Sequence, residues 1–136
     1  MTEEWMLLDT SAGVVFDGAT LRIPAVRRSL DSFELLVEVE HDGREAFRRV
    51  SLFSVPSCSP ADLLSLTIRW HDQSLTEVNA APPSGGPSAS VSFGTMNGNR
   101  MLFGVRVLGA TSLPLSVAAH WPAAGVLAAS LPIGNR

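Results

Sequence analysis

Lysine and tyrosine are absent from this chain of 136 residues, and cysteine occurs once, at Cys58. Without lysine there is no side-chain amine for a Schiff base or for gripping a phosphate, and all 10 basic residues are arginines. A single cysteine excludes an intrachain disulfide and a metal site built from several cysteines, which favours a reducing compartment. The lack of lysine and tyrosine, beside plentiful alanine, arginine, glycine and proline, is typical of a G/C-rich genome, so we expect a bacterial source.

Acidic residues are missing from the C-terminal part of the chain. All 13 lie within residues 1–77, whereas residues 78–136 contain only Arg100, Arg106 and Arg136 as charged residues. The net charge of −3 and the absence of a basic run argue against nucleic-acid binding, which depends on clustered arginine and lysine. Residues 107–135, the uncharged C-terminal third, contain neither an acid nor an arginine. Surfaces usually carry charge, so this third is either buried or covered by another chain.

Long apolar runs are also missing. Prolines and a histidine interrupt the C-terminal stretch well short of the roughly 20 residues that a membrane-spanning helix needs. The start of the chain is acidic and lacks the basic region and apolar core of a secretory signal. We therefore expect a soluble cytoplasmic protein. Its length suits a single domain over residues 1–136 that folds without metal or disulfides.

Alternation of apolar and polar residues dominates the sequence and predicts strands. In residues 33–40 the apolar side chains fall on one face and three glutamates on the other, as in a half-buried strand with one wet face. The dipeptide Asp42-Gly43 then predicts a tight hairpin turn to a return strand over residues 45–55. The glutamates on the wet face are Glu34, Glu38 and Glu40.

Further turn signals predict four more strand pairs. They join residues 14–16 to 19–23, 66–70 to 74–79, 90–93 to 101–107, and 115–120 to 126–131. Helix signals are few, and a serine cap followed by proline predicts at most one short helix near residues 59–64. Residues 80–90, rich in proline, glycine and serine, predict a flexible loop. About nine short strands predict an all-β fold, an antiparallel two-sheet sandwich of jelly-roll type.

Groups suited to catalysis are scarce, and we expect neither enzyme activity nor a cofactor. His71 and Asp72 are neighbours in the sequence, and with a serine or a metal they could form a hydrolase or metal site. Neighbouring residues of a strand point to opposite faces, so a polar turn after Trp70 explains this pair better. A metal held between two hairpin tips, or glycosidase chemistry by paired glutamates, is a weaker alternative.

The favoured hypothesis is that the protein is a non-enzymatic interaction or assembly module that uses the uncharged third as its interface. It would self-associate or bind a protein partner by burying apolar surface. Residues expected in this interface, or in the deep core beside it, are Val107, Leu115, Val117, Trp121, Val126 and Leu131.

The alternative hypothesis is a lectin-like sandwich that binds carbohydrate. Trp121 stands beside a proline in a predicted turn, so we expect it to be exposed and able to stack on a sugar ring. His71 and Asp72 would complete the site. Trp70, by contrast, shares its face with two apolar neighbours and is expected in the core. The loops expected around the site are residues 41–44, 71–74 and 81–90.

Overall fold

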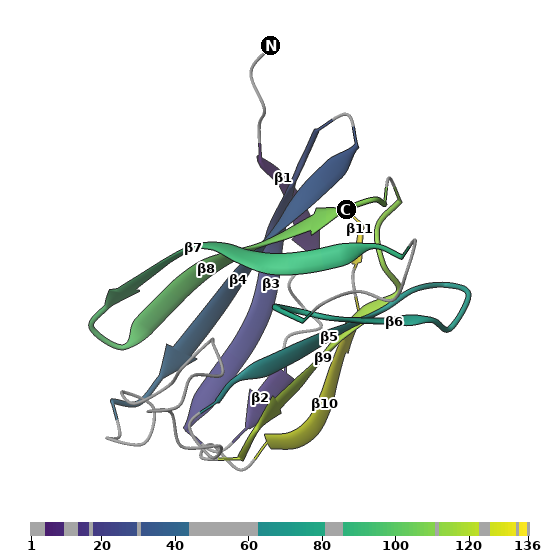
Figure 1. The fold of residues 1–136 in the computed structure, drawn as a ribbon. Coiled ribbons are helices and arrows are strands. Elements are labelled where there is room, and N and C mark those ends of the chain that lie inside the picture. The colour runs from purple at the N-terminus through teal and green to yellow at the C-terminus, as the bar shows by residue number, and fades with distance from the viewer. Residues whose placement is uncertain are drawn as a thin grey trace.

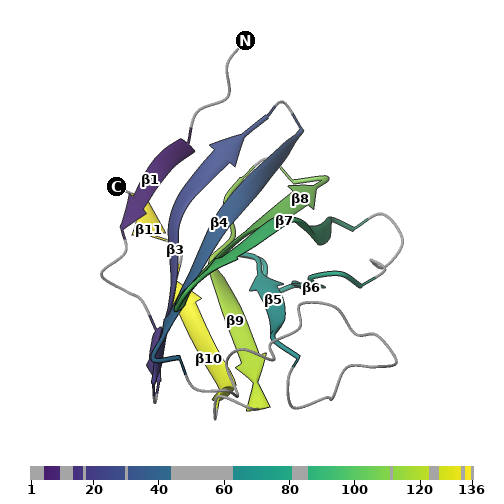
Figure 2. The ribbon, with the colours of Figure 1, turned by 90° about the vertical axis from the view of Figure 1, so that its left-hand side faces the viewer.

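Two antiparallel sheets make up the fold in the computed structural model (Figure 1, Figure 2). The structure describes residues 5–9, 14–16, 18–29, 31–43, 63–80, 86–110, 112–122, 126–132 and 134–135. The large sheet contains β1 (Trp5–Asp9), β2 (Val14–Phe16), β3 (Ala19–Arg28), β4 (Ser32–His41), β7 (Ser88–Asn97), β8 (Arg100–Leu108) and β11 (Gly134–Asn135). The small sheet contains β5 (Ser65–Arg69), β6 (Leu75–Glu77), β9 (Ser116–Trp121) and β10 (Val126–Pro132).

Some neighbouring strands of each sheet are joined by hairpins, and others come from distant parts of the chain. In the large sheet the order is β11-β1-β3-β4-β8-β7, with β2 also paired to β3, and in the small sheet it is β10-β9-β5-β6. The small sheet lies against one face of the large sheet (Figure 2). The predicted all-β sandwich is thus confirmed, whereas the jelly-roll type stays a prediction. Within the described residues, no helix is long and apolar enough to cross a membrane.

The four strand pairs predicted from turn signals are all present, as β2–β3, β5–β6, β7–β8 and β9–β10. Two of their turns depend on glycine, because Gly18 and Gly98 adopt φ values of +84° and +61°. These values lie in the left-handed region that side-chain-bearing residues rarely occupy. The local turn chemistry therefore sets these hairpins directly.

The hairpin predicted at Asp42-Gly43 is wrong. Gly43 does adopt a positive φ of +87°, but β4 is a central strand with β3 on one side and β8 on the other. Neither edge of β4 is left for a return strand, and residues 45–55 themselves lie outside the described residues. The dipeptide thus correctly predicted a positive φ at Gly43, but it did not predict which strands pair with β4.

Two other local predictions fall only partly on residues that the structure describes. Of the short helix predicted near residues 59–64, the described end is not helical, and Leu64 is buried in the core. Of the loop predicted at residues 80–90, Ser88 and its two successors belong to β7, while residues 81–85 lie outside the described residues.

The core lies between the sheets and is built from the inward rows of β3, β4, β8, β5 and β9. Trp70 is 8% exposed, packs edge-on against Phe33 with ring centroids 6.2 Å apart, and donates its indole N–H to Thr76 Oγ1 at 2.8 Å. The prediction that Trp70 belongs to the core is confirmed.

The sheets are joined along one side by the segment that follows β6. Val78 bridges Ala89 of β7, and the backbone N–H of Asn79 donates to the Ala89 carbonyl at 2.8 Å. The side-chain oxygen of Asn79 accepts the N–H of Val91 at 2.9 Å. Beyond this junction β7 continues with β8 past the small sheet (Figure 1). On the opposite side, β10 lies beside β2.

Candidate functional site

The outer face of the large sheet, which points away from the small sheet, carries the glutamates of β4. Glu34 and Glu38 are only 7% and 8% exposed, although Glu40 is exposed as predicted. The expectation of a uniformly wet face is therefore wrong. Because β4 is central, arginines from both neighbouring strands lie over its outer side, and their stems exclude water from the carboxylates.

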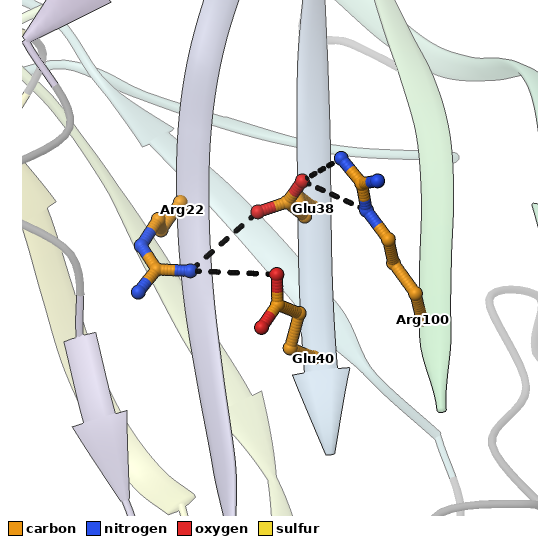
Figure 3. Close-up of polar contacts among 4 residues, drawn as sticks. All are labelled: Arg22, Glu38, Glu40 and Arg100. Carbon is orange, nitrogen blue, oxygen red and sulfur yellow. Dashed lines mark hydrogen bonds and ion pairs between the residues drawn. The ribbon is translucent and has the colours of Figure 1, made fainter. Parts of the chain in front are cut away.

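The first of two ion-pair clusters surrounds Glu38 (Figure 3). Arg100 of β8 donates from Nε to Glu38 Oε2 at 3.0 Å, with a second hydrogen bond from Nη2. From the other side, Arg22 Nη1 of β3 lies 3.5 Å from Glu38 Oε1 and 3.9 Å from Glu40 Oε1. A single buried carboxylate thus joins three adjacent strands. Such charge-assisted contacts fix the register of the strands as well as adding stability.

The second cluster surrounds Glu34 at the other end of β4. Arg27 of β3 donates to Glu34 Oε1, and Ser92 of β7 donates its hydroxyl to Glu34 Oε2. The Arg27 guanidinium also lies 4.6 Å from the centroid of the Trp5 ring, a cation–π distance. This cluster therefore links β1, β3, β4 and β7.

Gly104 of β8 has no side chain, which leaves room for side chains of β7 to contact β4 across β8. A Cβ atom at Gly104 would lie 2.4 Å from Cε1 of Phe93 and 2.7 Å from Oγ of Ser92. The Phe93 ring and the Ser92 hydroxyl occupy the space that a side chain would need. Ser92 is also where the β7–β8 register shifts, between Val91 and Phe93, which re-aims these side chains.

Apolar side chains lie between the two clusters and form what we call the outer strip, consisting of Leu36, Phe93 and Leu102. Leu36 and Phe93 both pair with Gly104, while Leu102 pairs with Glu38. Phe93 remains 38% exposed, and the two leucines are half-buried. An apolar centre between charged groups is the usual anatomy of a protein–protein interface.

The outer strip ends at a sheet edge. Residues Phe93–Asn97 of β7, which we call the free edge, have β8 as their only ladder partner among the described residues. All five are exposed, with Phe93 at 38% and Met96 at 50%. The sequence contains no charged residue between Glu77 and Arg100. Natural edge strands are usually protected by charges, prolines or short length, and this segment has neither charge nor proline.

The uncharged third occupies a different place from the one that the interface hypothesis expected. Val107, Val117 and Trp121 are 0%, 2% and 0% exposed and belong to the core. The expected exposure of Trp121 is wrong, because this residue ends β9 as a paired strand residue and is buried in the core. Leu115 is 39% exposed just before β9. These strands lack charge because they fill the interior.

The remaining interface candidates, Val126 and Leu131, lie on β10, where they pair with Trp121 and Val117. Their side chains lie outside the description. The burial of Trp121 also removes the aromatic platform on which the carbohydrate-binding hypothesis was built. Of the loops expected around that site, residues 71–74 form the described β5–β6 turn, and residues 81–85 lie outside the described residues.

His71 and Asp72 lie in the β5–β6 turn and are both exposed. Asp72 Oδ1 accepts the backbone N–H of Ser74 at 2.9 Å and its hydroxyl at 2.5 Å. These two hydrogen bonds, the hydroxyl's first, lower the pKa of Asp72 below its ordinary value of 3.8. The carboxylate is thus engaged within its own turn. Among the described residues, no group of three or more potential metal ligands converges.

No family model, curated protein or solved structure matches the chain. Function is therefore inferred from the surface features alone, among which the outer strip and the free edge stand together at one side of the large sheet.

Proposed function

We propose that the protein is an assembly module whose copies join through the free edge, Phe93–Asn97. In this arrangement the free edges of two copies pair antiparallel about a two-fold axis and extend the large sheet from one copy into the next. Backbone hydrogen bonds across the new ladder supply affinity, as in other cases of strand addition. The contact is isologous, so each copy supplies the same surface.

The side chains of the free edge suit pairing with an identical strand. Antiparallel pairing of residues 93–97 with a second copy places Thr95 opposite its own counterpart, so a charge at or beside the axis would lie close to its like. Residues 78–99 contain no charged residue, so no such repulsion arises. Phe93 supplies an apolar contact on the outer face, where it continues the outer strip. Met96, paired with the buried Met101, supplies one on the other face.

The observation that carries the proposal is an exposed, charge-free edge with two large apolar side chains. The assembly hypothesis drawn from the sequence is kept, but its surface moves from the uncharged third to β7. Burial of Val107, Val117 and Trp121 in the core supports this move, because these side chains are not available to a partner.

The proposal is tested by light scattering coupled to size-exclusion chromatography over a concentration series. The wild-type protein is expected at twice the chain mass of 14.5 kDa. The variant Thr95→Glu places two carboxylates opposite each other at the centre of the free edge. We expect it to raise the dimer dissociation constant at least tenfold without unfolding the chain, since Thr95 is exposed.

The matched control is Ser90→Glu, which introduces the same charge on the same strand. Ser90 is exposed, but it lies in the part of β7 that is hydrogen-bonded to Asn79. Its cross-strand neighbour is Arg106, whose guanidinium can donate hydrogen bonds to the new carboxylate. This variant should dimerise like the wild type. A monomeric wild-type protein, or a Thr95→Glu variant as dimeric as Ser90→Glu, would overturn the proposal.

A further inference from the structure

A cavity of about 270 Å³ opens between the sheets where β5 and β6 face β7 and β8. Its accessible apolar lining includes the half-buried Leu63, Val78 and Val91. Polar groups lie towards solvent, with the half-buried Thr67 and the exposed Glu77 side by side on paired strands. The cavity thus combines an apolar end with a polar rim.

The cavity lies beside the contact between the segment after β6 and β7. β6 is only three residues long, and the Asn79 hydrogen bonds to β7 hold the edges of the two sheets together just after it. These bonds fix one wall from the small sheet and one from the large sheet. A site whose walls are already held apart requires little ordering when a ligand binds.

Glu77 determines the charge of any ligand that the cavity prefers. Among the lining residues that the structure describes, it is the only charged one. Within the part of the chain that the structure describes, its carboxylate has neither an ion pair nor a hydrogen bond. A cationic group at this rim would gain the Glu77 carboxylate as a partner, whereas an anionic group would meet like charge.

We propose that this cavity binds a small amphipathic amine, with an apolar or aromatic body against Leu63, Val78 and Val91 and its ammonium group at Glu77. The size fits such a molecule, because an apolar cavity of roughly 150 Å³ already accepts a benzene ring. The additional volume accommodates a short aminoalkyl chain that reaches the rim. This inference does not depend on self-assembly, since none of the cavity residues belongs to the free edge.

The test uses three probes of similar size, 2-phenylethylamine, 2-phenylethanol and phenylacetate, titrated into the full chain by calorimetry and ligand-observed NMR. The amine should bind saturably and at least tenfold more tightly than the alcohol, and phenylacetate should bind most weakly. Glu77→Gln should reduce amine binding to the level of the alcohol. The control Asp31→Asn removes an exposed carboxylate elsewhere and should leave the preference intact.

A second variant tests the apolar end of the cavity. Val91→Phe fills the interior and should weaken all three probes together, with thermal unfolding used to verify that the chain is folded. The Thr95→Glu variant should bind the amine as the wild type does, which separates this inference from dimerisation. Absence of saturable amine binding to the wild type, or an amine preference that survives Glu77→Gln, would overturn the proposal.

Discussion

The two sheets of this sandwich use charge in opposite ways. On the large sheet, Glu34 and Glu38 are buried beneath arginines of neighbouring strands, so electrostatic contacts link strands across the outer face. On the small sheet, the outward row of the central strands includes the half-buried Thr67 and its neighbour Ala118, and its exposed Arg69 has no ion pair among the described residues. The comparison teaches that the large sheet is stabilised on both faces, whereas the small sheet depends chiefly on packing at its inner face.

The largest expected effect comes from removing that packing. Trp121→Ala deletes a side chain that is 0% exposed, and it should lower the free energy of unfolding by about 3–5 kcal/mol. Leu115→Ala, in the same uncharged third but 39% exposed, should cost less than about 1 kcal/mol. Chemical denaturation measures both. Equal losses would mean that the uncharged third does not serve mainly as core.

A smaller effect is expected from the outer face of the large sheet. Glu38→Gln leaves Arg22 and Arg100 without their shared carboxylate, and we expect a loss of about 1–3 kcal/mol in the free energy of unfolding. The range lies below that of a fully buried pair because the arginine side chains are 35% and 55% exposed. Urea denaturation at low and high salt gives the measurement.

The matched control for Glu38→Gln is Glu40→Gln, on the same strand and face. The Glu40 side chain is 55% exposed and lies 3.9 Å from Arg22, so its loss should cost less than about 0.5 kcal/mol. If the two variants lose the same stability, burial of the carboxylate contributes nothing, and the contrast between the sheets is weaker than described.

The smallest effect is expected at Asp72, a carboxylate of the small sheet that acts only within its own turn. Because Ser74 lowers its pKa in the folded state, Asp72 contributes stability above its ordinary pKa of 3.8, and that contribution disappears as pH falls through the folded value. The stability difference between wild type and Asp72→Asn should therefore shrink in acid. In Ser74→Ala, an NMR titration should show the pKa of Asp72 rising towards 3.8, and an unchanged value would contradict this assignment.

The sequence predicted the strands because alternation and turn dipeptides are local signals. Gly18 and Gly98 adopt the backbone conformation that their turns require, and their hairpins form as expected. The same kind of dipeptide gave a wrong hairpin prediction at Gly43, because a positive φ at one glycine does not determine which strand pairs with β4. Partners brought together from distant parts of the chain depend on the whole sheet order.

The candidate site was harder to predict for the same reason. Alternation correctly put Glu34 and Glu38 on the outer face, but only the pairing of β4 with β3 and β8 brings arginines over them. The free edge could have been anticipated from its lack of charge, yet the same lack was read in the uncharged third as a sign of an interface. A strand without charge is either central or at an unprotected edge, and composition does not distinguish the two.

The space above Gly104 has a consequence for how the sequence can change. Any larger residue there would meet both the Phe93 ring and the Ser92 hydroxyl, so one substitution would disturb an apolar contact and the Glu34 cluster together. Position 104 therefore has less mutational freedom than its exposed surroundings suggest. A change at this position therefore requires coordinated replacement on β7 as well as on β8.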